Sequence, residues 1–215
     1  MPASSGSTDM NAVALDTVLK HPGVWRQSAA AQHHVRALPT GLAELDALLP
    51  GGGWPCGALS EILFAFDGVG ELSLLLPVLA ELTRSGKRVV FVAPPYIPYA
   101  PALAAQGLDL RHVVQIESAS TQGAWSAEQC LRSGSCGAVL SWMQQADYTQ
   151  LRRLQLAAES GDALAFLFRP ARAAAKPSPA ALRLQLHADA GRVDVEILKC
   201  RGRLNSLHPT RLRCA

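Results

Sequence analysis

Two patterns of hydrophobic residues alternate along the middle of this chain. Short runs that are apolar at every position predict strands buried on both faces, and segments with apolar residues at helical spacing predict the helices that accompany them. The strands are predicted at 58–66, 88–93, 112–117, 137–142 and 163–168, and the helices at 43–49, 70–85, 98–106, 124–132 and 147–160. This alternation predicts an α/β fold with a mainly parallel sheet flanked by helices.

The pattern changes toward both ends of the chain. Residues 169–180, rich in Pro, Ala and basic side chains, predict a loop, and residues 181–199 alternate as in an antiparallel hairpin with its turn at 189–191. The basic residues that follow have little periodicity, and a short helix capped by Asp9 is predicted near the N-terminus. Three parts are therefore expected: a flexible start with a short helix and a linker at 1–37, a core domain at 38–200 and a basic tail at 201–215.

Composition fits this fold and excludes other classes of protein. The chain has 215 residues, of which 49% are hydrophobic and 17% charged, enough for one α/β domain with a substantial core. Glu81, Arg84 and Lys87 interrupt the longest apolar run before it reaches the roughly 18 residues of a membrane span. No export signal is recognisable, and the five cysteines lack the spacing of a zinc site. We expect a cytoplasmic protein that uses neither a membrane nor a metal ion.

Basic residues are concentrated at the C-terminal end. The net charge is +3, yet the residues from 165 onward contain ten Lys or Arg against three Asp or Glu. This asymmetry indicates a face for an acidic partner or for nucleic acid. A solvated sheet edge protected by cations would show the same asymmetry, and the sequence leaves both interpretations open.

The stretch AFDGVGEL, residues 65–72, stands between a predicted strand and a predicted helix, where nucleotide-binding proteins keep their phosphate loop. Gly68 and Gly70 suit such a turn, and Gly70 fits the second glycine of GxxxxGK[ST]. Ala65 then replaces the first glycine, Glu71 the phosphate-binding lysine and Leu72 the magnesium-binding hydroxyl. A carboxylate ~4 Å from a phosphate charge would be repelled by about 4 kcal/mol at an effective dielectric constant of about 20. We expect a degenerate phosphate loop and no cofactor.

The order of segments along the chain resembles that of RecA-type recombinases. The resemblance covers roughly residues 38–200 and rests on LPTGLAELDALLPGGGWPCGALSEI before the loop and on RSGKRVVFVAPP, GLDLRHVV and RSGSCGAVLSW after it. It implies a RecA-like P-loop NTPase core. Within that superfamily the chain is similar to the ImuA family, through the first of these segments and through GxGELxLLLPxL and LSWMQQADYTQLRRLQLAAE. A more distant relative in fold is the division inhibitor SulA, which blocks the tubulin-like protein FtsZ.

The resemblance also implies that the residues of ATP hydrolysis are missing. RecA's catalytic glutamate falls at Pro95, and its magnesium-linked aspartate falls near Ser141 or Trp142. With the lysine also absent, we expect a protein that is not an ATPase. Lys199 and Arg201 stand at the spacing of a K-x-K pair that reaches the neighbouring subunit's ATP in a RecA filament, which makes them candidates for a RecA interface. Two exposed cations at a strand end are the alternative.

The function implied by this resemblance is that of a non-catalytic accessory protein in mutagenic translesion DNA synthesis, induced in the SOS response to DNA damage and nucleoid-associated when acting. Its partners would be RecA and the polymerase-like protein ImuB. Cations of the loop and the tail could add weak, non-specific contacts to DNA or a partner; they are Arg169, Arg172, Lys176, Arg203, Arg211 and Arg213. The alternative is a SulA-like cell-division inhibitor that binds FtsZ, against which the long N-terminal match and the basic C-terminus argue.

Overall fold

The computed structural model describes residues 36–118, 122–189, 192–202 and 210–214. Met1–His34 forms a unit separate from Val35–Ala215, and all the described residues belong to the second unit. The helix predicted after Asp9 lies outside the described residues, as does Arg203.

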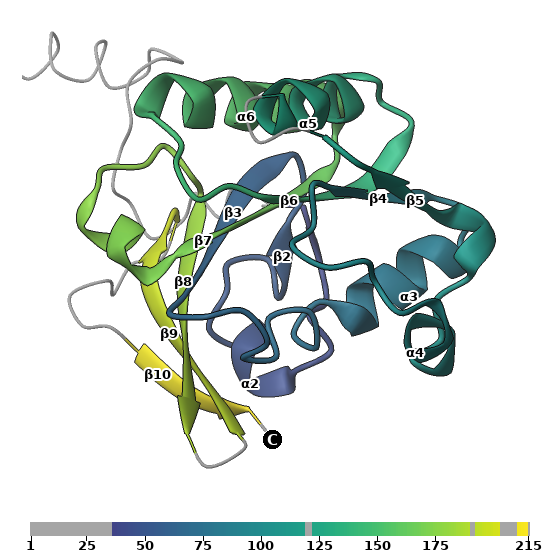
Figure 1. The fold of residues 1–215 in the computed structure, drawn as a ribbon. Helices are drawn as coiled ribbons and strands as arrows, with labels where there is room; N and C mark the ends of the chain where they lie inside the picture. Colours follow the sequence, from purple (N-terminus) through teal and green to yellow (C-terminus); the bar gives the residue numbers. More distant parts are fainter. Residues whose placement is uncertain (1–35, 119–121, 190–191, 203–209, 215) are drawn as a thin grey trace, which may run out of the picture. The chain divides into compact units, whose positions relative to one another are not determined.

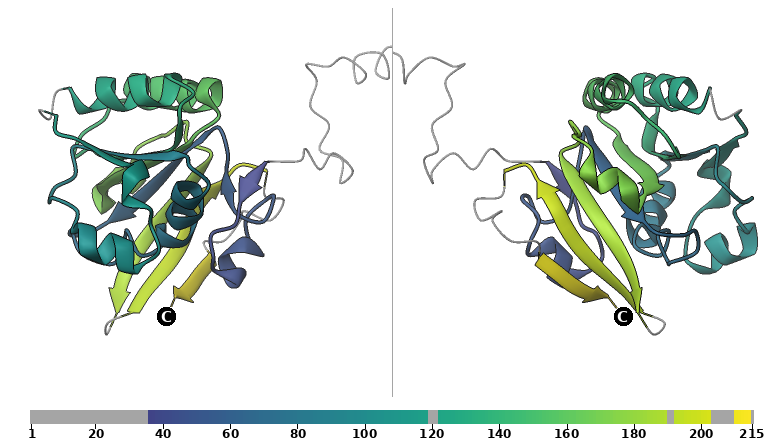
Figure 2. Two further views of the ribbon diagram at one scale, coloured as in Figure 1. Left: turned by 90° about the vertical axis from the view of Figure 1, so that its right-hand side faces the viewer. Right: turned by 60° about the vertical axis from the view of Figure 1, so that its left-hand side comes forward.

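One sheet of eight strands organises the described chain, in the order β10-β9-β8-β3-β7-β6-β4-β5 (Figure 1). The strands are β3 (Ala58–Phe64), β4 (Arg88–Val92), β5 (Val113–Ile116), β6 (Cys136–Trp142), β7 (Leu164–Pro170), β8 (Leu182–Asp189), β9 (Arg192–Cys200) and β10 (Thr210–Cys214). The pairs from β8 through β3 to β5 are parallel, whereas β8–β9 and β9–β10 are antiparallel. The predicted mainly parallel sheet with a C-terminal hairpin is confirmed, and the hairpin stands out in Figure 2.

Helices cover both faces of the sheet. They are α2 (Ala43–Asp46), α3 (Leu76–Arg84), α4 (Ala100–Ala105), α5 (Gly123–Arg132) and α6 (Tyr148–Gly161), with short 3-10 turns η1 (Leu110–His112) and η2 (Ala171–Ala175). Helices α5 and α6 lie on one face, and α2, α3 and α4 lie on the other (Figure 1). Two hydrophobic clusters fill the two layers between helices and sheet.

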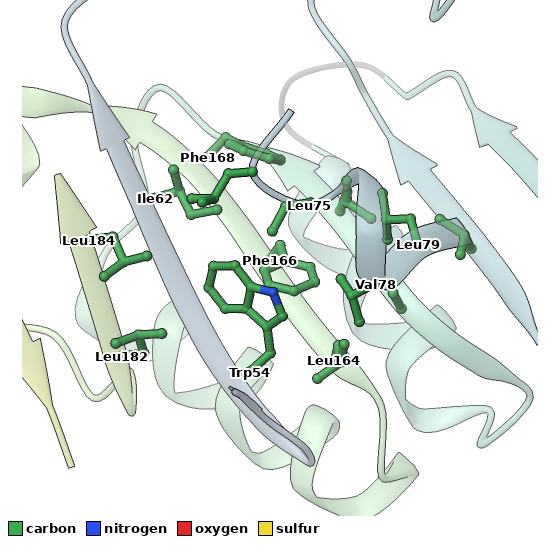
Figure 3. Close-up of a cluster of buried hydrophobic side chains, with 14 of the residues drawn as sticks. Trp54, Ile62, Leu75, Val78, Leu79, Leu164, Phe166, Phe168, Leu182 and Leu184 are labelled. Carbon is green, nitrogen blue, oxygen red and sulfur yellow. The ribbon is translucent and has the colours of Figure 1, made fainter. Parts of the chain in front are cut away.

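A completely buried tryptophan lies in the larger cluster, on the α3 side of the sheet. Trp54, in the short strand β2 (Trp54–Pro55) that pairs with β1 (Ala37–Leu38), meets Phe166 edge to face with ring centroids 5.1 Å apart at 87° (Figure 3). Such an aromatic pair adds about 1 kcal/mol beyond the burial of its surface. Around it, Figure 3 shows Leu75, Val78 and Leu79 facing the sheet.

Several boundaries differ from the sequence predictions. The helix predicted from residue 70 begins at Leu76, so that Pro77 stands in its first turn, where no hydrogen bond is lost and no kink results. Strand β7 continues to Pro170, so Arg169 belongs to a strand and not to the predicted loop. The sequence does not predict β10, which pairs antiparallel with β9 inside the expected tail. The predicted cap at Asp147 is confirmed, since its carboxylate accepts the Gln150 N–H at 2.7 Å.

Within the described residues, no helix is long and apolar enough to span a membrane. The same residues contain no cluster of three or more His, Cys, Asp or Glu side chains arranged to hold a metal ion.

Candidate functional site: the turn after β3 and the basic cluster beside it

The turn between β3 and α3, residues 65–75, contains the stretch that the sequence analysis interprets as a degenerate phosphate loop. Gly68 and Gly70 have φ angles of +85° and +93°, which only glycine adopts without strain. Gly70 is required for a second reason, since a Cβ there would lie 2.9 Å from Val193 Cγ2 of β9. The two glycines therefore shape a turn that packs closely on the hairpin.

The glutamate at the lysine position points back into this turn. Glu71 is nearly buried, and its Oε1 accepts a hydrogen bond from the backbone N–H of Gly68 at 3.4 Å. In a phosphate loop such amides face the ligand's oxygens. Here an internal carboxylate takes one of those amides, and the second charge of the turn, Asp67, is also negative.

The other two phosphate-loop replacements differ in exposure. Ala65 is exposed, whereas Leu72 is half-buried and packs against the core cluster on the α3 side. A hydrophobic side chain in that place anchors the turn to the core and leaves no hydroxyl to hold a magnesium ion.

The positions that the RecA resemblance relates to ATP hydrolysis hold no acidic side chain. Pro95 is exposed in the loop after β4. Ser141 is buried in β6, where its Oγ donates to the Phe166 carbonyl at 3.4 Å. Trp142 stacks on Phe168 with centroids 4.5 Å apart. The carboxyl end of β4 is thus followed by Pro95, and β6 ends with Ser141 bonded to the backbone and with the packed ring of Trp142.

Arg169 is a correction to the predicted set of surface cations, because it is almost completely buried. Its Nη1 donates to Glu61 Oε1 at 2.7 Å, and its Nη2 donates to the Ala146 carbonyl at 3.0 Å. Arg183 of β8 reaches the other oxygen of the same carboxylate, Nε to Glu61 Oε2 at 2.6 Å. Glu61, Arg169 and Arg183 form a buried ionic triad across β7, β3 and β8, and none of its members is free to bind DNA or a partner.

The triad is joined to a row of backbone carbonyls in the segment after β7. Arg183 Nη2 donates to the Ala173 carbonyl at 2.8 Å, and its Nη1 donates to the carbonyls of Ala174 and Lys176 at 3.3 and 3.2 Å. These contacts hold residues 171–176 against the sheet.

The two predicted interface cations continue this row. Lys199 Nζ donates to the Ser178 carbonyl at 2.8 Å, and Arg201 Nη2 donates to the Pro179 carbonyl at 3.5 Å. Partial burial, with additional contributions from the nearby Arg201 and Arg183, lowers the pKa of Lys199. Lys199 and Arg201 thus both donate to carbonyls of the segment after β7, and their candidacy as a RecA interface stays a prediction.

The other predicted cations are placed as follows. Arg172 and Lys176 are exposed on the segment after β7. Arg211 and Arg213 belong to β10, opposite Glu196 and Asp194 of β9 in the strand register. Arg172 and Lys176 have the exposed side chains that a surface contact requires.

Sequence reasoning missed Glu61 and Arg183. A signal was present, because Glu61 is the only charged residue in the apolar strand predicted at 58–66, and it is buried there. A buried carboxylate must be paired with a positive charge or with hydrogen-bond donors. The sequence did not reveal which residues pair with Glu61, because they lie 108 and 122 residues further along the chain.

Exposed apolar side chains are concentrated around the carboxyl ends of the parallel strands. Phe66 follows β3, Tyr96, Ile97 and Tyr99 follow β4, and Tyr148 begins the helix after β6. The sequence analysis named none of them. Clusters of this kind mark sites of protein contact more often than single exposed residues do.

The fold is α/β, with a mostly parallel sheet flanked by helices, and its turn after β3 contains two acidic residues and no Lys or Arg. The chain matches the family model described as Cell division inhibitor SulA over residues 57–165, which is half of its length. It therefore belongs to the SulA family.

Individual relatives agree with this family. The chain is 29% identical over 115 residues to the Cell division inhibitor SulA of Yersinia pestis (strain Pestoides F), a match that covers 53% of this chain and 68% of the relative. The same values hold for the Cell division inhibitor SulA of Yersinia pseudotuberculosis serotype O:1b (strain IP 31758). Among solved structures, SulA from Pseudomonas aeruginosa is 23% identical, with a TM-score of 0.44 and coverage of 52% of this chain and 97% of that one.

The family match ends inside β7. Strands β8, β9 and β10, which follow it, carry Arg183 and Lys199 and lead into Arg201, and the segment before residue 57 with α2 and Trp54 lies outside the match as well.

Proposed function

We propose that this protein is a non-catalytic inhibitor of cell division that acts by binding FtsZ. Membership of the SulA family and the names of the Yersinia relatives support this function over the translesion role implied by the ImuA resemblance. The alternative of the sequence analysis thus becomes the first choice. Such a protein would act in the cytoplasm, where FtsZ assembles.

The family match carries the inhibitor function, and the position of Glu71 carries its non-catalytic part. The carboxylate binds an amide of its own turn, and residues 65–75 contain no Lys or Arg to receive a phosphate. We infer that the turn is a degenerate phosphate loop of a RecA-like P-loop core. A fold of this kind that does not hold nucleotide acts through its surface.

Purified FtsZ tests the proposal. We expect the full chain to reduce both GTP hydrolysis and polymer sedimentation of FtsZ in proportion to its concentration. We also expect no heat of ATP binding in a calorimetric titration of the chain alone. Normal FtsZ assembly at a several-fold excess of the protein would reject the function, and tight ATP binding would reject the non-catalytic assignment.

A second candidate function is the ImuA-like one, with RecA and ImuB as partners. It is favoured by residues 166–215, which lie outside the SulA match and contain ten of the chain's twenty Lys and Arg residues. Lys199 and Arg201 are the candidate contacts to a RecA filament, and Arg172 and Lys176 are candidates for weak, non-specific contacts to DNA.

A pull-down with RecA filaments tests this second candidate. Because Lys199 and Arg201 hold the carbonyls of Ser178 and Pro179, Lys199→Ala with Arg201→Ala changes both charge and backbone. The pair Lys87→Ala and Arg152→Ala removes two exposed charges that belong to neither candidate contact and serves as the matched control. Loss of binding only in the first variant supports the RecA interface, and undiminished binding in both rejects it.

A further inference from the structure

Three bulky side chains project from the loop that joins β4 to α4. Residues 93–99, which we name the Tyr-Ile-Tyr loop, contain Tyr96, Ile97 and Tyr99, which are 73%, 78% and 71% exposed. They are the three most exposed large hydrophobic side chains in the described part of the chain. The sequence analysis assigned no role to them, and the packing of the core does not require them.

Both ends of this loop are fixed to the fold. At its start the N–H of Ala93 donates to the Ile116 carbonyl of β5 at 2.9 Å, and Ala93 has a φ of +49°, a conformation few alanines adopt. At its end the Tyr99 carbonyl accepts the N–H groups of Ala102 and Leu103 at 3.0 and 3.1 Å, which starts α4. The loop is therefore presented from two anchored ends.

Prolines restrict the backbone between these anchors. Pro94, Pro95 and Pro98 lie within the loop, and Pro101 follows it. Each proline fixes its own φ, and each also restricts the residue before it. Little conformational freedom is left to lose on binding, so exposed side chains here contribute to affinity with a small entropic loss.

The chemistry of the loop selects its partner. No charged residue occurs from Val89 to Leu108. Nucleic acids and anionic lipid surfaces are bound chiefly through Lys and Arg, so neither suits this loop. Tyrosines beside an aliphatic side chain, in contrast, are the residues that anchor protein interfaces in apolar pockets.

We propose that the Tyr-Ile-Tyr loop is the principal contact with FtsZ, with Tyr96, Ile97 and Tyr99 entering an apolar cleft on that protein. This inference rests on the proposed function. The inference adds a named contact surface to that function. It also predicts that the contact is apolar, whereas the basic C-terminal end would suggest an electrostatic contact.

The test compares two serine variants of the full chain in binding to purified FtsZ. The first carries Tyr96→Ser, Ile97→Ser and Tyr99→Ser, and we expect it to bind about 100-fold more weakly than the unchanged chain. The matched control carries Leu110→Ser and Leu156→Ser, two side chains that are 39% and 43% exposed on η1 and α6. The control should bind within about twofold of the unchanged chain. Both variants should melt like the unchanged chain, since they alter exposed positions.

The outcomes separate the two proposals. If the unchanged chain binds FtsZ and the triple variant binds equally well, the loop assignment is wrong and the proposed function stands. If the unchanged chain does not bind FtsZ, both fail together. Raising the salt concentration from about 50 to about 200 mM gives an independent check, since an apolar contact should change affinity by less than about threefold. A steep loss with salt would overturn the loop assignment in favour of a contact through exposed cations such as Arg172 and Lys176.

Discussion

Two glutamates ten residues apart, Glu61 and Glu71, show how differently one fold can treat the same side chain. Glu61 lies in the middle of β3, completely buried, and binds two guanidinium groups from β7 and β8. Glu71 lies in the turn after β3, is also nearly buried, and binds the N–H of Gly68. The first joins segments far apart in the sequence, and the second acts within its own turn.

The difference indicates where ionic interactions carry the stability of this protein. A carboxylate removed from water is costly unless opposite charges surround it, and two arginines compensate Glu61 at 2.7 and 2.6 Å. Glu71 has a neutral donor at a long distance, so its loss should matter less. Its carboxylate instead occupies a backbone amide of the turn and adds a second acidic group beside Asp67.

Of the substitutions that test the difference between the two glutamates, Glu61→Gln should reduce stability most. This change leaves Arg169 and Arg183 buried without a compensating charge, and we expect the free energy of unfolding to fall by about 3–5 kcal/mol. The melting temperature should fall by roughly 10 °C, given about 2–4 °C per kcal/mol for a domain of this size. Thermal unfolding followed by circular dichroism measures the change.

Glu81→Gln is the matched control for this prediction. Glu81 pairs with Arg84 at 3.3 Å on the exposed face of α3, and such pairs contribute about 0.5 kcal/mol or less. If the two Glu→Gln variants unfold at the same temperature, the buried triad does not have the importance assigned to it.

The shape of the turn should depend more on Gly70 than on Glu71. Gly70→Ala places a Cβ at a φ of +93° and 2.9 Å from Val193 Cγ2, and we expect about 2 kcal/mol of destabilisation in urea unfolding. Gly86→Ala is the control, since Gly86 has a φ of +79° but a Cβ added there would meet no atom within 4 Å. Gly86→Ala should lower the free energy of unfolding only through the strained backbone conformation, by about 1 kcal/mol. Equal costs at the two glycines would mean that the contact with β9 is unimportant.

Glu71→Ala should have a smaller effect than either Glu61→Gln or Gly70→Ala. The hydrogen bond to Gly68 is long, and we expect a loss of about 1 kcal/mol or less in urea unfolding. Glu71→Gln keeps an acceptor for the amide and should unfold like the unchanged chain. A loss in Glu71→Ala as large as that in Glu61→Gln would contradict the distinction drawn between the two glutamates.

The same contrast explains what the sequence could predict. Features that depend on residues close in sequence could be predicted, because the interacting residues lie within a few positions of one another. The cap at Asp147 and the glycine turn at 68–70 are examples. The hydrophobic runs gave the parallel strands for the same reason. Arg169 was misplaced because its partner Glu61 lies 108 residues away, and nothing local distinguishes a buried arginine from an exposed one. Strand β10 was missed because its five residues gain their order from pairing with β9.

The smallest expected effect concerns Lys199, whose Nζ donates to the Ser178 carbonyl in the segment after β7. Partial burial and the neighbouring Arg201 and Arg183 lower its pKa, so between that value and the ordinary lysine value of 10.5 the unfolded chain binds more protons than the folded one. Over this alkaline window the unchanged chain should gain stability, as pH rises, relative to Lys199→Gln. Urea unfolding at several pH values up to 10.5 measures the difference. In an Arg201→Gln background the pKa of Lys199 should lie closer to its ordinary value, so the gain should shrink. A gain that is unchanged in that background would show that Arg201 does not influence Lys199.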